Sequence, residues 1–301
     1  MVVPTISVVI PTLNASSDIE RLLDILERQS ITPCDIVVID SQSDDDTVKK
    51  AEVYNSVRVI KISRGDFNHG LTRHYAALET SGDYICFLTQ DAIPTNENYL
   101  ANIVAPMESD SEIALVSARQ IPKENARRFE QLVRNFNYPN HSSVRSKADL
   151  DIYGIKTFFA SDACSAYRRK AYLECGGFPQ VNTNEDMLMA AFLIAAGWKV
   201  AYEPKAAVYH SHNLTLRQQY NRNKQIGIFL EVHAQDLMYA NEIGEGKRLV
   251  MQVSLQLLKE GRVGEFLSFV CDCVARLAGN RMGRYLASHS VSSSRKKGTI
   301  Q

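Results

Sequence analysis

Three short apolar segments of the chain, residues 6–10, 36–39 and 84–88, are each followed closely by side chains that can hydrogen bond a polar ligand. These side chains are Thr12, Asn14, Asp40, Ser41, Gln90 and Asp91. Carboxylates accept hydrogen bonds without donating any, and they also ligate divalent cations. Taken singly, each residue also fits a structural role, because an aspartate after a strand often caps the next helix.

Two further clusters combine residue types that could act on a substrate. Glu185 and Asp186 open an apolar helical segment, where the helix dipole alone also favours acidic side chains. His210 and His212 follow a short strand, and alternate residues of an extended segment share one face. The two histidines could therefore ligate one ion, or form a hydrogen-bonded pair on the surface.

The apolar pattern predicts the elements that position these clusters. Continuous apolar runs at residues 6–10, 36–39, 57–60 and 84–88 predict buried strands, the first of them ended by Pro11. Amphipathic helical segments separate these runs, which is typical of a doubly wound, mostly parallel, Rossmann-like α/β sheet. Ligands of such sheets bind at the carboxyl ends of the strands, so we expect the polar clusters to share one crevice.

The second half of the chain is less regular. We expect further strands at residues 113–116, 155–160, 199–202 and 207–209, helices at residues 127–136 and 187–196, and a mobile polar loop at residues 139–151. From residue 216 onward the pattern is helical, with pauses at Gly244, Gly246, Gly261 and Gly264. Residues 251–258 and 266–270 predict a helical hairpin, and the basic tail from residue 292 is expected to fray.

The composition excludes several classes of protein. The 301 residues carry 34 basic and 34 acidic side chains, and this zero formal charge argues against a general nucleic-acid binder. No apolar run approaches the ~18 residues of a membrane-spanning helix, and the first residues lack the pattern of a signal peptide. The six scattered cysteines are expected to be reduced, mostly buried thiols of a cytoplasmic enzyme.

Four motifs occur in a fixed order between Ser7 and His212. They are residues 11–14 (PTLN), residues 37–47 (VVIDSQSDDDT), Asp91, and the pair Glu185 and Asp186. This ordered set resembles the family 2 glycosyltransferases, which have the GT-A fold. The resemblance implies a nucleotide-sugar glycosyltransferase domain over residues 1–213 and a C-terminal helical region over residues 214–301.

Three more segments resemble a narrower group, the bacterial rhamnosyltransferases. They are residues 67–73 (FNHGLTR), 88–94 (LTQDAIP) and 210–213 (HSHN). The resemblance implies transfer of L-rhamnose from dTDP-rhamnose during synthesis of a bacterial surface polysaccharide. A UDP-hexose or UDP-galactofuranose donor stays open, as does a non-catalytic carbohydrate-binding module. The segment after the first strand lacks the glycine-rich loop of a nucleotidyltransferase or a dehydrogenase.

The resemblance also implies roles for individual residues toward a nucleotide-diphosphate sugar. The Asp40 carboxylate would accept a hydrogen bond from the imide of a uracil or thymine ring. The planar guanidinium of Arg73 would bind the diphosphate, although an arginine on this helix could simply face solvent. The implied nucleotide-binding residues are Thr12, Asn14, Asp40, Ser41, Arg73 and Gln90.

The metal motif of the family, Asp-x-Asp, is present only in part, because Thr89 stands at its first position and Asp91 at its last. One carboxylate can suffice for Mg²⁺, which also uses substrate phosphates and water. His210 or His212 could add a ligand, and imidazole would favour Mn²⁺. We therefore expect Mg²⁺ or Mn²⁺ to bind mainly as a nucleotide complex.

The family chemistry is an inverting transfer without a covalent sugar–enzyme intermediate. Asp186 is expected to be the catalytic base that takes the proton of the acceptor hydroxyl. Glu185 is next in sequence and faces elsewhere on the helix, so it is expected to hold an acceptor hydroxyl or to orient a neighbouring residue.

The expected partners follow from this chemistry. They are a nucleotide-diphosphate sugar and a saccharide or lipid-linked saccharide acceptor, with no nucleic acid. The location is expected to be cytoplasmic, with or without contact to the inner face of the membrane. The C-terminal helices could make that contact through basic residues, or they could pack as a domain or form a homodimer interface.

Overall fold

The computed structural model of the chain describes residues 4–241 and 244–297. The chain divides into two compact units. Unit 1 comprises Met1–Glu124 and Asn137–Ser211, and unit 2 comprises Asn125–Phe136 and His212–Gln301. The short segment from Asn125 to Phe136 therefore belongs with the C-terminal helices, although it lies far from them in sequence.

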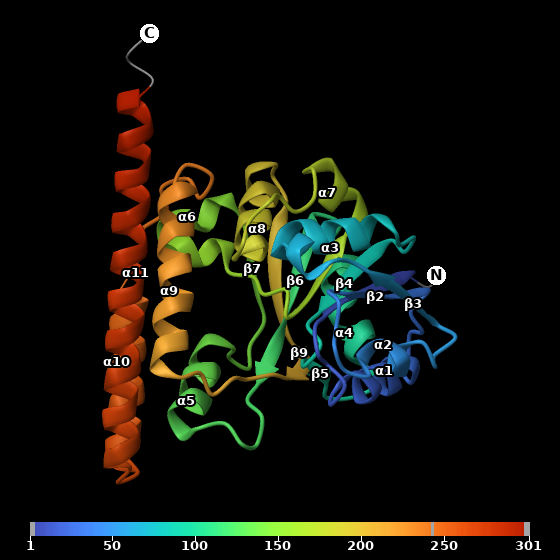
Figure 1. The fold of residues 1–301 in the computed structure, drawn as a ribbon, viewed down its shortest axis with the longest axis horizontal. Coiled ribbons are helices and arrows are strands. Elements are labelled where there is room, and N and C mark those ends of the chain that lie inside the picture. The colour runs from blue at the N-terminus through green and yellow to red at the C-terminus, as the bar shows by residue number, and fades with distance from the viewer. Residues whose placement is uncertain (1–3, 242–243, 298–301) are drawn as a thin grey trace. The chain divides into compact units, whose positions relative to one another are not determined.

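Unit 1 is built around one mixed sheet, seen edge-on at the centre right of Figure 1. Its first half consists of the four predicted parallel strands, β1 (Ile6–Thr12), β2 (Asp35–Asp40), β3 (Val57–Lys61) and β4 (Tyr84–Leu88). Pro11 does not end β1, because the strand continues to Thr12 and pairs with β2 up to Asp40. The carboxyl ends of β1 and β2 therefore lie side by side.

The other strands make the second half of the sheet mixed in direction. The full order is β3-β2-β1-β4-β8-β6-β9-β5, and β7 pairs with β9. These strands are β5 (Ile93–Pro94), β6 (Ile113–Ile121), β7 (Ser143–Arg145), β8 (Cys164–Arg168) and β9 (Lys199–Tyr209). Only the β6–β9 pair is parallel among the strand pairings of this half. The predicted α/β sheet of mostly parallel strands is confirmed.

Helices cover both faces of this sheet. Val8 and Cys86 on one face pack with the buried sides of α1 (Ile19–Glu27) and α4 (Tyr99–Ser109). On the other face, the Phe87 ring contacts Tyr172 of α7 (Arg169–Glu174) and Phe178. The remaining helices of unit 1 are α2 (Thr47–Ala51), α3 (His69–Leu78), α6 (Leu150–Tyr153) and α8 (Glu185–Ala195), with 3₁₀ turns at Arg64–Asp66, Lys147–Asp149 and Gly154–Phe158.

Several expectations for the second half of the chain were wrong. The expected strand at residues 155–160 is mostly the 3₁₀ turn Gly154–Phe158, and the strand of this region is β8. The expected mobile loop at residues 139–151 contains β7 and a second 3₁₀ turn. The two expected strands around Pro204 form one strand, β9, with a shift of register in its pairing with β6. Hydrogen bonds and pairings with distant segments order these stretches, and a local pattern does not show them.

Unit 2 is helical and contains α5 (Arg128–Asn137), α9 (Leu216–Val232), α10 (Glu245–Lys259) and α11 (Val263–Lys297). The predicted hairpin is confirmed as α10 and α11, which meet at Gly261 with its positive φ of 68°. Gly246 and Gly264 lie inside these helices and do not interrupt them. The tail stays helical from residue 292 to Lys297, and the rest of the expected frayed segment lies outside the described residues.

Glycines let α9 and α11 pack closely. A Cβ atom at Gly227 would lie 2.2 Å from the carbonyl oxygen of Asn280, and one at Gly283 would lie 2.0 Å from that of Lys224. Side chains at these positions would push the helices apart, so the glycines determine the helix spacing of unit 2.

Within residues 4–241 and 244–297, none of the helices is long and apolar enough to cross a bilayer. All six cysteines are free. Cys34 and Cys271 are exposed, so the thiols are less buried than expected.

Candidate active site

A cavity of about 280 Å³ lies at the carboxyl ends of β1 and β4, where the sequence predicted a ligand crevice. Five of the predicted site residues line it: Thr12, Ser41, Arg73, Gln90 and Asp91. Its other lining residues are Pro11, Leu13, Arg64, Phe67, His69 and Thr89. Two arginines and a histidine give this cavity the side chains that suit an anionic ligand.

Three buried polar atoms of the cavity residues have no hydrogen-bond partner within the described part of the chain. They are Ser41 Oγ, Thr89 Oγ1 and Arg73 Nε. Buried polar groups are nearly always hydrogen-bonded in folded proteins, because an unsatisfied group costs about 1–3 kcal/mol. A bound polar ligand could satisfy these atoms.

Asp40 lies at the end of β2, next in sequence to the cavity residue Ser41. Its carboxylate accepts hydrogen bonds from the Thr12 hydroxyl (2.9 Å), the Ser43 hydroxyl (2.6 Å) and the Ser43 backbone N–H (2.8 Å). Asp40 is almost completely buried and is not among the lining residues. The carboxylate thus organises the segment after β2, while Ser41 faces the cavity.

Asn14 and Gln90 shape the neighbouring backbone. Asn14 has a positive φ of 52°, and its side-chain oxygen accepts a hydrogen bond from Asp44 N–H (2.9 Å). The Gln90 amide accepts from Leu13 N–H (2.7 Å) and donates to the Leu13 carbonyl (3.1 Å). Gln90 therefore ties the segment after β4 to the segment after β1 and lines the cavity, whereas Asn14 is not among the lining residues.

Arg73 connects the cavity to a second, acidic cluster. It is buried on α3, not facing solvent, and its guanidinium pairs with Glu185 (3.0 Å) and donates to the His69 carbonyl (3.1 Å). Gly70 makes this approach of α3 feasible, because a Cβ there would lie 2.0 Å from the Pro179 carbonyl oxygen. The predicted residues Arg73 and Glu185 are thus brought together by elements that are distant in sequence.

Asp186 lies beside Glu185 at the first turn of α8. Its carboxylate accepts hydrogen bonds from the backbone N–H groups of Met187 (2.7 Å) and Asp162 (3.2 Å). Burial, together with the carboxyls of Glu185 and Asp162, raises the pKa of Asp186 well above its ordinary value. An elevated pKa makes a carboxylate a stronger base toward a hydroxyl proton.

Asp162 is a member of this cluster that the sequence did not reveal. It is fully buried, accepts hydrogen bonds from the hydroxyls of Ser165 (2.5 Å) and Tyr167 (2.8 Å), and keeps its other oxygen without a partner. Burial and the Glu185 carboxylate raise the pKa of Asp162 to about 7, against the opposing effect of Arg73. Asp162 lies two residues before β8, so the strand expected at residues 155–160 gave no indication of it.

The raised pKa of Asp162 predicts a dependence of stability on pH. A carboxyl with a raised folded-state pKa stabilises the fold while it is protonated, and that contribution is lost between about pH 4 and pH 7. Because each pKa unit corresponds to about 1.4 kcal/mol, the loss amounts to up to about 4 kcal/mol. Asp162→Asn keeps the acceptor for Ser165 and Tyr167 and cannot ionise. Its melting temperature should exceed that of the wild type at pH 8 by more than at pH 4.5.

Thermal unfolding of both proteins across this pH range tests the effect. Asp162→Ala serves as the control, because it removes the acceptor and should be less stable than the wild type at both pH values. An Asp162→Asn protein whose melting temperature parallels that of the wild type at all pH values would contradict the assignment.

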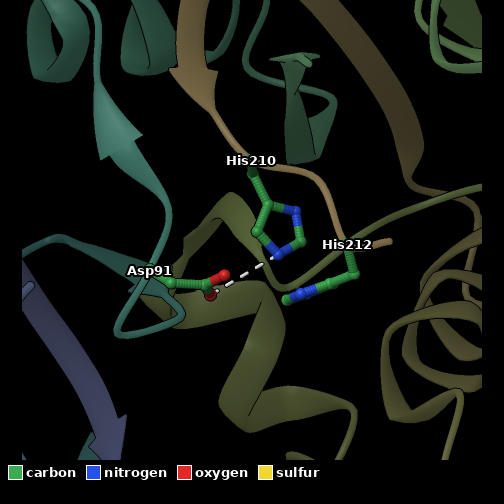
Figure 2. A group of neighbouring side chains, drawn as sticks. All are labelled: Asp91, His210 and His212. Atoms are coloured by element: carbon green, nitrogen blue, oxygen red, sulfur yellow. Dashed lines mark ion pairs between the residues drawn. The ribbon is translucent and has the colours of Figure 1, made fainter. Parts of the chain in front are cut away.

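Asp91 lies near the predicted histidines and could hold a cation with them. Its carboxylate is 3.5 Å from His210 Nε2 and 3.4 Å from Lys123 Nζ. His210 contacts Gln120 through Nδ1 (2.8 Å), which orients Nε2 toward Asp91. The ligand atoms of Asp91, His210 and His212 lie within 4.8 Å of one another. Figure 2 shows the three side chains facing one another. One carboxylate and two imidazoles fit a divalent cation of the Mn²⁺ type.

His210 and His212 follow a strand, as the sequence predicted. β9 ends at Tyr209, so His210 and His212 lie in the irregular segment after the strand and not on a strand face. Sequence reasoning also missed Arg64, His69 and Lys123. His69 lies inside the Phe67–Arg73 motif and Arg64 lies three residues before it, so that motif was the available signal for both.

The chain is similar in sequence to several known proteins. The model of the family "Glycosyl transferase family 2" matches residues 7–176. The chain is 39% identical over 296 residues to the O-antigen chain rhamnosyltransferase RfbN of Salmonella typhimurium, covering 96% of this chain and 93% of that protein. It is 36% identical over 299 residues to the O-antigen chain rhamnosyltransferase WbaN of Salmonella anatum, covering 97% and 93%.

Solved structures share the fold at low sequence identity. A mannosyltransferase from Pyrobaculum calidifontis in complex with GDP-Man and Mn²⁺ aligns with a TM-score of 0.58 at 18% identity, covering 96% of this chain and 86% of that one. TarS of S. aureus, residues 1–349 in complex with UDP-GlcNAc, aligns with a TM-score of 0.57 at 14% identity, covering 93% and 92%. Both are similar to this chain in fold, and the predicted GT-A architecture is confirmed.

Proposed function

Because the chain belongs to glycosyl transferase family 2, we propose that it transfers a rhamnosyl group from a nucleotide diphosphate to an acceptor hydroxyl of a bacterial surface polysaccharide. The predicted class of enzyme, a family 2 glycosyltransferase, is confirmed. Two relatives that match nearly the full length of the chain are named as O-antigen chain rhamnosyltransferases, and this supports rhamnose as the sugar.

One observation carries the proposal for the donor site. The cavity at the carboxyl ends of β1 and β4 contains three buried polar atoms without partners and two arginines, Arg64 and Arg73. We assign the diphosphate to this cationic part, and the base to the part near Thr12 and Ser41. Asp40, Asn14 and Gln90 support this proposal because they hold the backbone that forms the cavity.

Asp186 is the proposed catalytic base. It would take the proton of the acceptor hydroxyl while the hydroxyl oxygen bonds to the anomeric carbon and the bond to the diphosphate breaks. The proton passes to the carboxylate, and the electron pair of the broken bond leaves with the diphosphate. Backbone N–H groups of Asp162 and Met187 hold the carboxylate in one orientation. Glu185 could hold a second acceptor hydroxyl, and in this structure it pairs with Arg73.

Asp91, His210 and His212 would hold Mg²⁺ or Mn²⁺ at the edge of the cavity. The ion would offset negative charge on the leaving diphosphate. The Lys123 ammonium pairs with the same Asp91 carboxylate, so part of the negative charge of Asp91 is already neutralised in the free protein. Binding of the ion should therefore be weak without nucleotide, as the single carboxylate also predicts.

The proposal includes a cytoplasmic location with a saccharide or lipid-linked saccharide as acceptor. The relatives are named as O-antigen chain enzymes, which supports a growing surface polysaccharide as the acceptor class. Contact with the inner face of the membrane is part of this proposal, because a lipid-linked acceptor would lie there.

A panel of nucleotide sugars tests the donor. Purified protein is incubated with dTDP-rhamnose, a UDP-hexose, UDP-galactofuranose and GDP-mannose, with and without Mn²⁺, and release of the nucleoside diphosphate is measured. We expect the fastest release from dTDP-rhamnose with Mn²⁺ present. Faster release from a UDP sugar would overturn the rhamnose assignment, and no release from any donor, even with added acceptor glycans, would favour a non-catalytic module.

A further inference from the structure

Gln120 is a buried glutamine of β6 whose two amide ends contact different parts of the candidate site. It is 2% exposed. Its Nε2 donates a hydrogen bond to the Ser161 hydroxyl (2.8 Å), and its Oε1 lies 2.8 Å from His210 Nδ1. A buried amide needs a partner at each end, because an unsatisfied polar group is costly inside a protein. Gln120 therefore joins His210 to the segment that precedes β8.

The contact with Gln120 determines which ring nitrogen of His210 can meet a cation. An amide oxygen only accepts hydrogen bonds, so Nδ1 carries the hydrogen when it bonds to Gln120 Oε1. A neutral imidazole has one N–H group, and Nε2 is then left with its lone pair. Nε2 is the nitrogen that lies 3.5 Å from the Asp91 carboxylate (Figure 2). Gln120 thus favours the form of His210 in which a ligand atom points toward Asp91.

The other end of Gln120 is held by the turn Ser161–Cys164, which a hydrogen bond of 3.0 Å closes between its first carbonyl and its last N–H. The first N–H of this turn donates to the Ser117 hydroxyl on β6 (3.3 Å). The Ala163 carbonyl accepts from the Thr89 N–H at the end of β4 (3.2 Å). Because the turn is tied to two strands, it is a fixed anchor for Gln120.

The same turn also holds the proposed base. The backbone N–H of Asp162, the second residue of the turn, donates to the Asp186 carboxylate (3.2 Å). One segment of backbone therefore positions Asp186 directly and His210 through Gln120. Groups that act on one substrate need a fixed separation, since a misplacement of about 1 Å can cost roughly 10²-fold in rate.

We propose that Gln120 is a positioning residue that presents Nε2 of His210 to a bound cation, with the turn Ser161–Cys164 as its anchor. This role rests on the proposed cation site of Asp91, His210 and His212. Hydrogen-bond partners behind a metal-binding histidine fix the orientation of its ring, and their loss typically lowers metal affinity by about 10- to 100-fold.

Two substitutions of Gln120 test this role through Mn²⁺ binding itself. Gln120→Met has a similar size but removes both polar ends of the amide, so the affinity for Mn²⁺ in the presence of dTDP should fall by roughly 10- to 100-fold. Gln120→Glu keeps an oxygen that accepts from His210 Nδ1, and the Ser161 hydroxyl can rotate to donate to the other oxygen. Its affinity for Mn²⁺ should stay within about threefold of the wild type or exceed it, because a carboxylate partner raises the basicity of a ligating histidine.

The order of the two variants separates positioning from packing. If Gln120 only filled space in the sheet, the apolar Gln120→Met would be tolerated better than Gln120→Glu, which places a charge among buried residues. The affinity is measured at pH 8 by electron paramagnetic resonance. Mn²⁺ is titrated into the protein with dTDP, and into dTDP alone as the blank.

Gln29→Met is the matched control. Gln29 is also a buried glutamine, and its amide bonds to the carbonyls of Ile25 and Asn96 and to the N–H of Leu100. None of these partners belongs to the candidate site. The control should lower the melting temperature and leave the affinity for Mn²⁺ unchanged, which shows that lost stability alone does not weaken Mn²⁺ binding.

A Gln120→Met protein that binds Mn²⁺ as tightly as the wild type would overturn the positioning role and leave the proposed cation site standing. A Gln120→Glu protein that loses affinity by about tenfold or more would do the same, even if Gln120→Met failed to fold. A wild type that binds no Mn²⁺ beyond the dTDP blank would instead overturn the cation site, and the role of Gln120 with it.

Discussion

Asp186→Asn is expected to lower kcat for sugar transfer by roughly 10²- to 10⁴-fold, the range that a positioned general base contributes. The amide cannot take the acceptor proton, but it has nearly the shape of the carboxyl and keeps an oxygen for the Asp162 N–H. Asp186 does not line the donor cavity, so the affinity for nucleotide should change by less than a few-fold. Steady-state rates with dTDP-rhamnose and calorimetry with dTDP give the two quantities.

The pH profile adds a second readout for the same residue. A base must be ionised to act, so the rate should fall as pH decreases through its pKa. The ordinary pKa of aspartate is near 4. Burial and the neighbouring carboxyls of Glu185 and Asp162 raise the pKa of Asp186, so the acidic limb of the rate should lie at a higher pH than that value. The residual activity of Asp186→Asn should lack this limb.

The matched control for this variant is Asp151→Asn, which neutralises an exposed carboxyl of α6. It should retain wild-type kcat and the wild-type pH profile. An Asp186→Asn protein with more than half of the wild-type kcat would remove Asp186 from the chemistry, even if donor binding were unchanged.

Three strands of the first half of the sheet, β1, β2 and β4, could be predicted because each is buried on both faces. Residues 36–39 are a continuous apolar run, and β2 is formed by them with Asp35 and Asp40 at its ends. The polar residues after such strands were expected to meet at one crevice, and Thr12, Ser41 and Asp91 do line one cavity. In this half of the sheet, the apolar runs of the sequence coincide with the strands that the fold buries.

β8 could not be predicted in the same way, because its residues do not form an apolar run. Ser165, Tyr167 and Arg168 interrupt the pattern, and their polar groups bond to Asp162, to Tyr84 and to backbone carbonyls of distant segments. The local pattern instead predicts a strand at the more apolar residues 155–160, which are mostly a 3₁₀ turn in the structure. Hydrogen bonds to distant residues, and not the local hydrophobicity of the sequence, therefore determine where this strand forms.

The acidic cluster shows the same limit at the site. Glu185 and Asp186 were found because they are adjacent in sequence and open a helix. Their environment was not visible, because Arg73 and Asp162 reach them through the packing of α3 and of the segment before β8. The sequence alone also allows a solvent-facing Arg73, whereas in the structure Arg73 is buried and pairs with Glu185.

Asp91→Asn is expected to lower kcat/KM for the nucleotide-sugar donor by roughly 10²- to 10³-fold, as is typical for loss of a group that stabilises developing charge. The variant removes the only carboxylate of the Asp91, His210 and His212 group. The concentration of Mn²⁺ that gives half-maximal rate should rise at least about tenfold, because a carboxylate binds a divalent cation better than a neutral amide. Rates measured across a Mn²⁺ titration, after removal of metal with EDTA, report both effects.

Lys123 makes this prediction discriminating, because its ammonium lies 3.4 Å from the same Asp91 carboxylate. If the lysine alone supplied the positive charge, EDTA would leave the wild-type rate unchanged and Lys123→Met would lower it sharply. If Asp91 holds a cation, EDTA should abolish the wild-type rate, added Mn²⁺ should restore it, and Lys123→Met should bind Mn²⁺ at least as tightly as the wild type, since a competing charge is gone. Glu174→Gln, at an exposed carboxylate of α7, is the control and should leave the Mn²⁺ dependence unchanged. Full activity of Asp91→Asn at the wild-type Mn²⁺ requirement would show that the cation is held elsewhere.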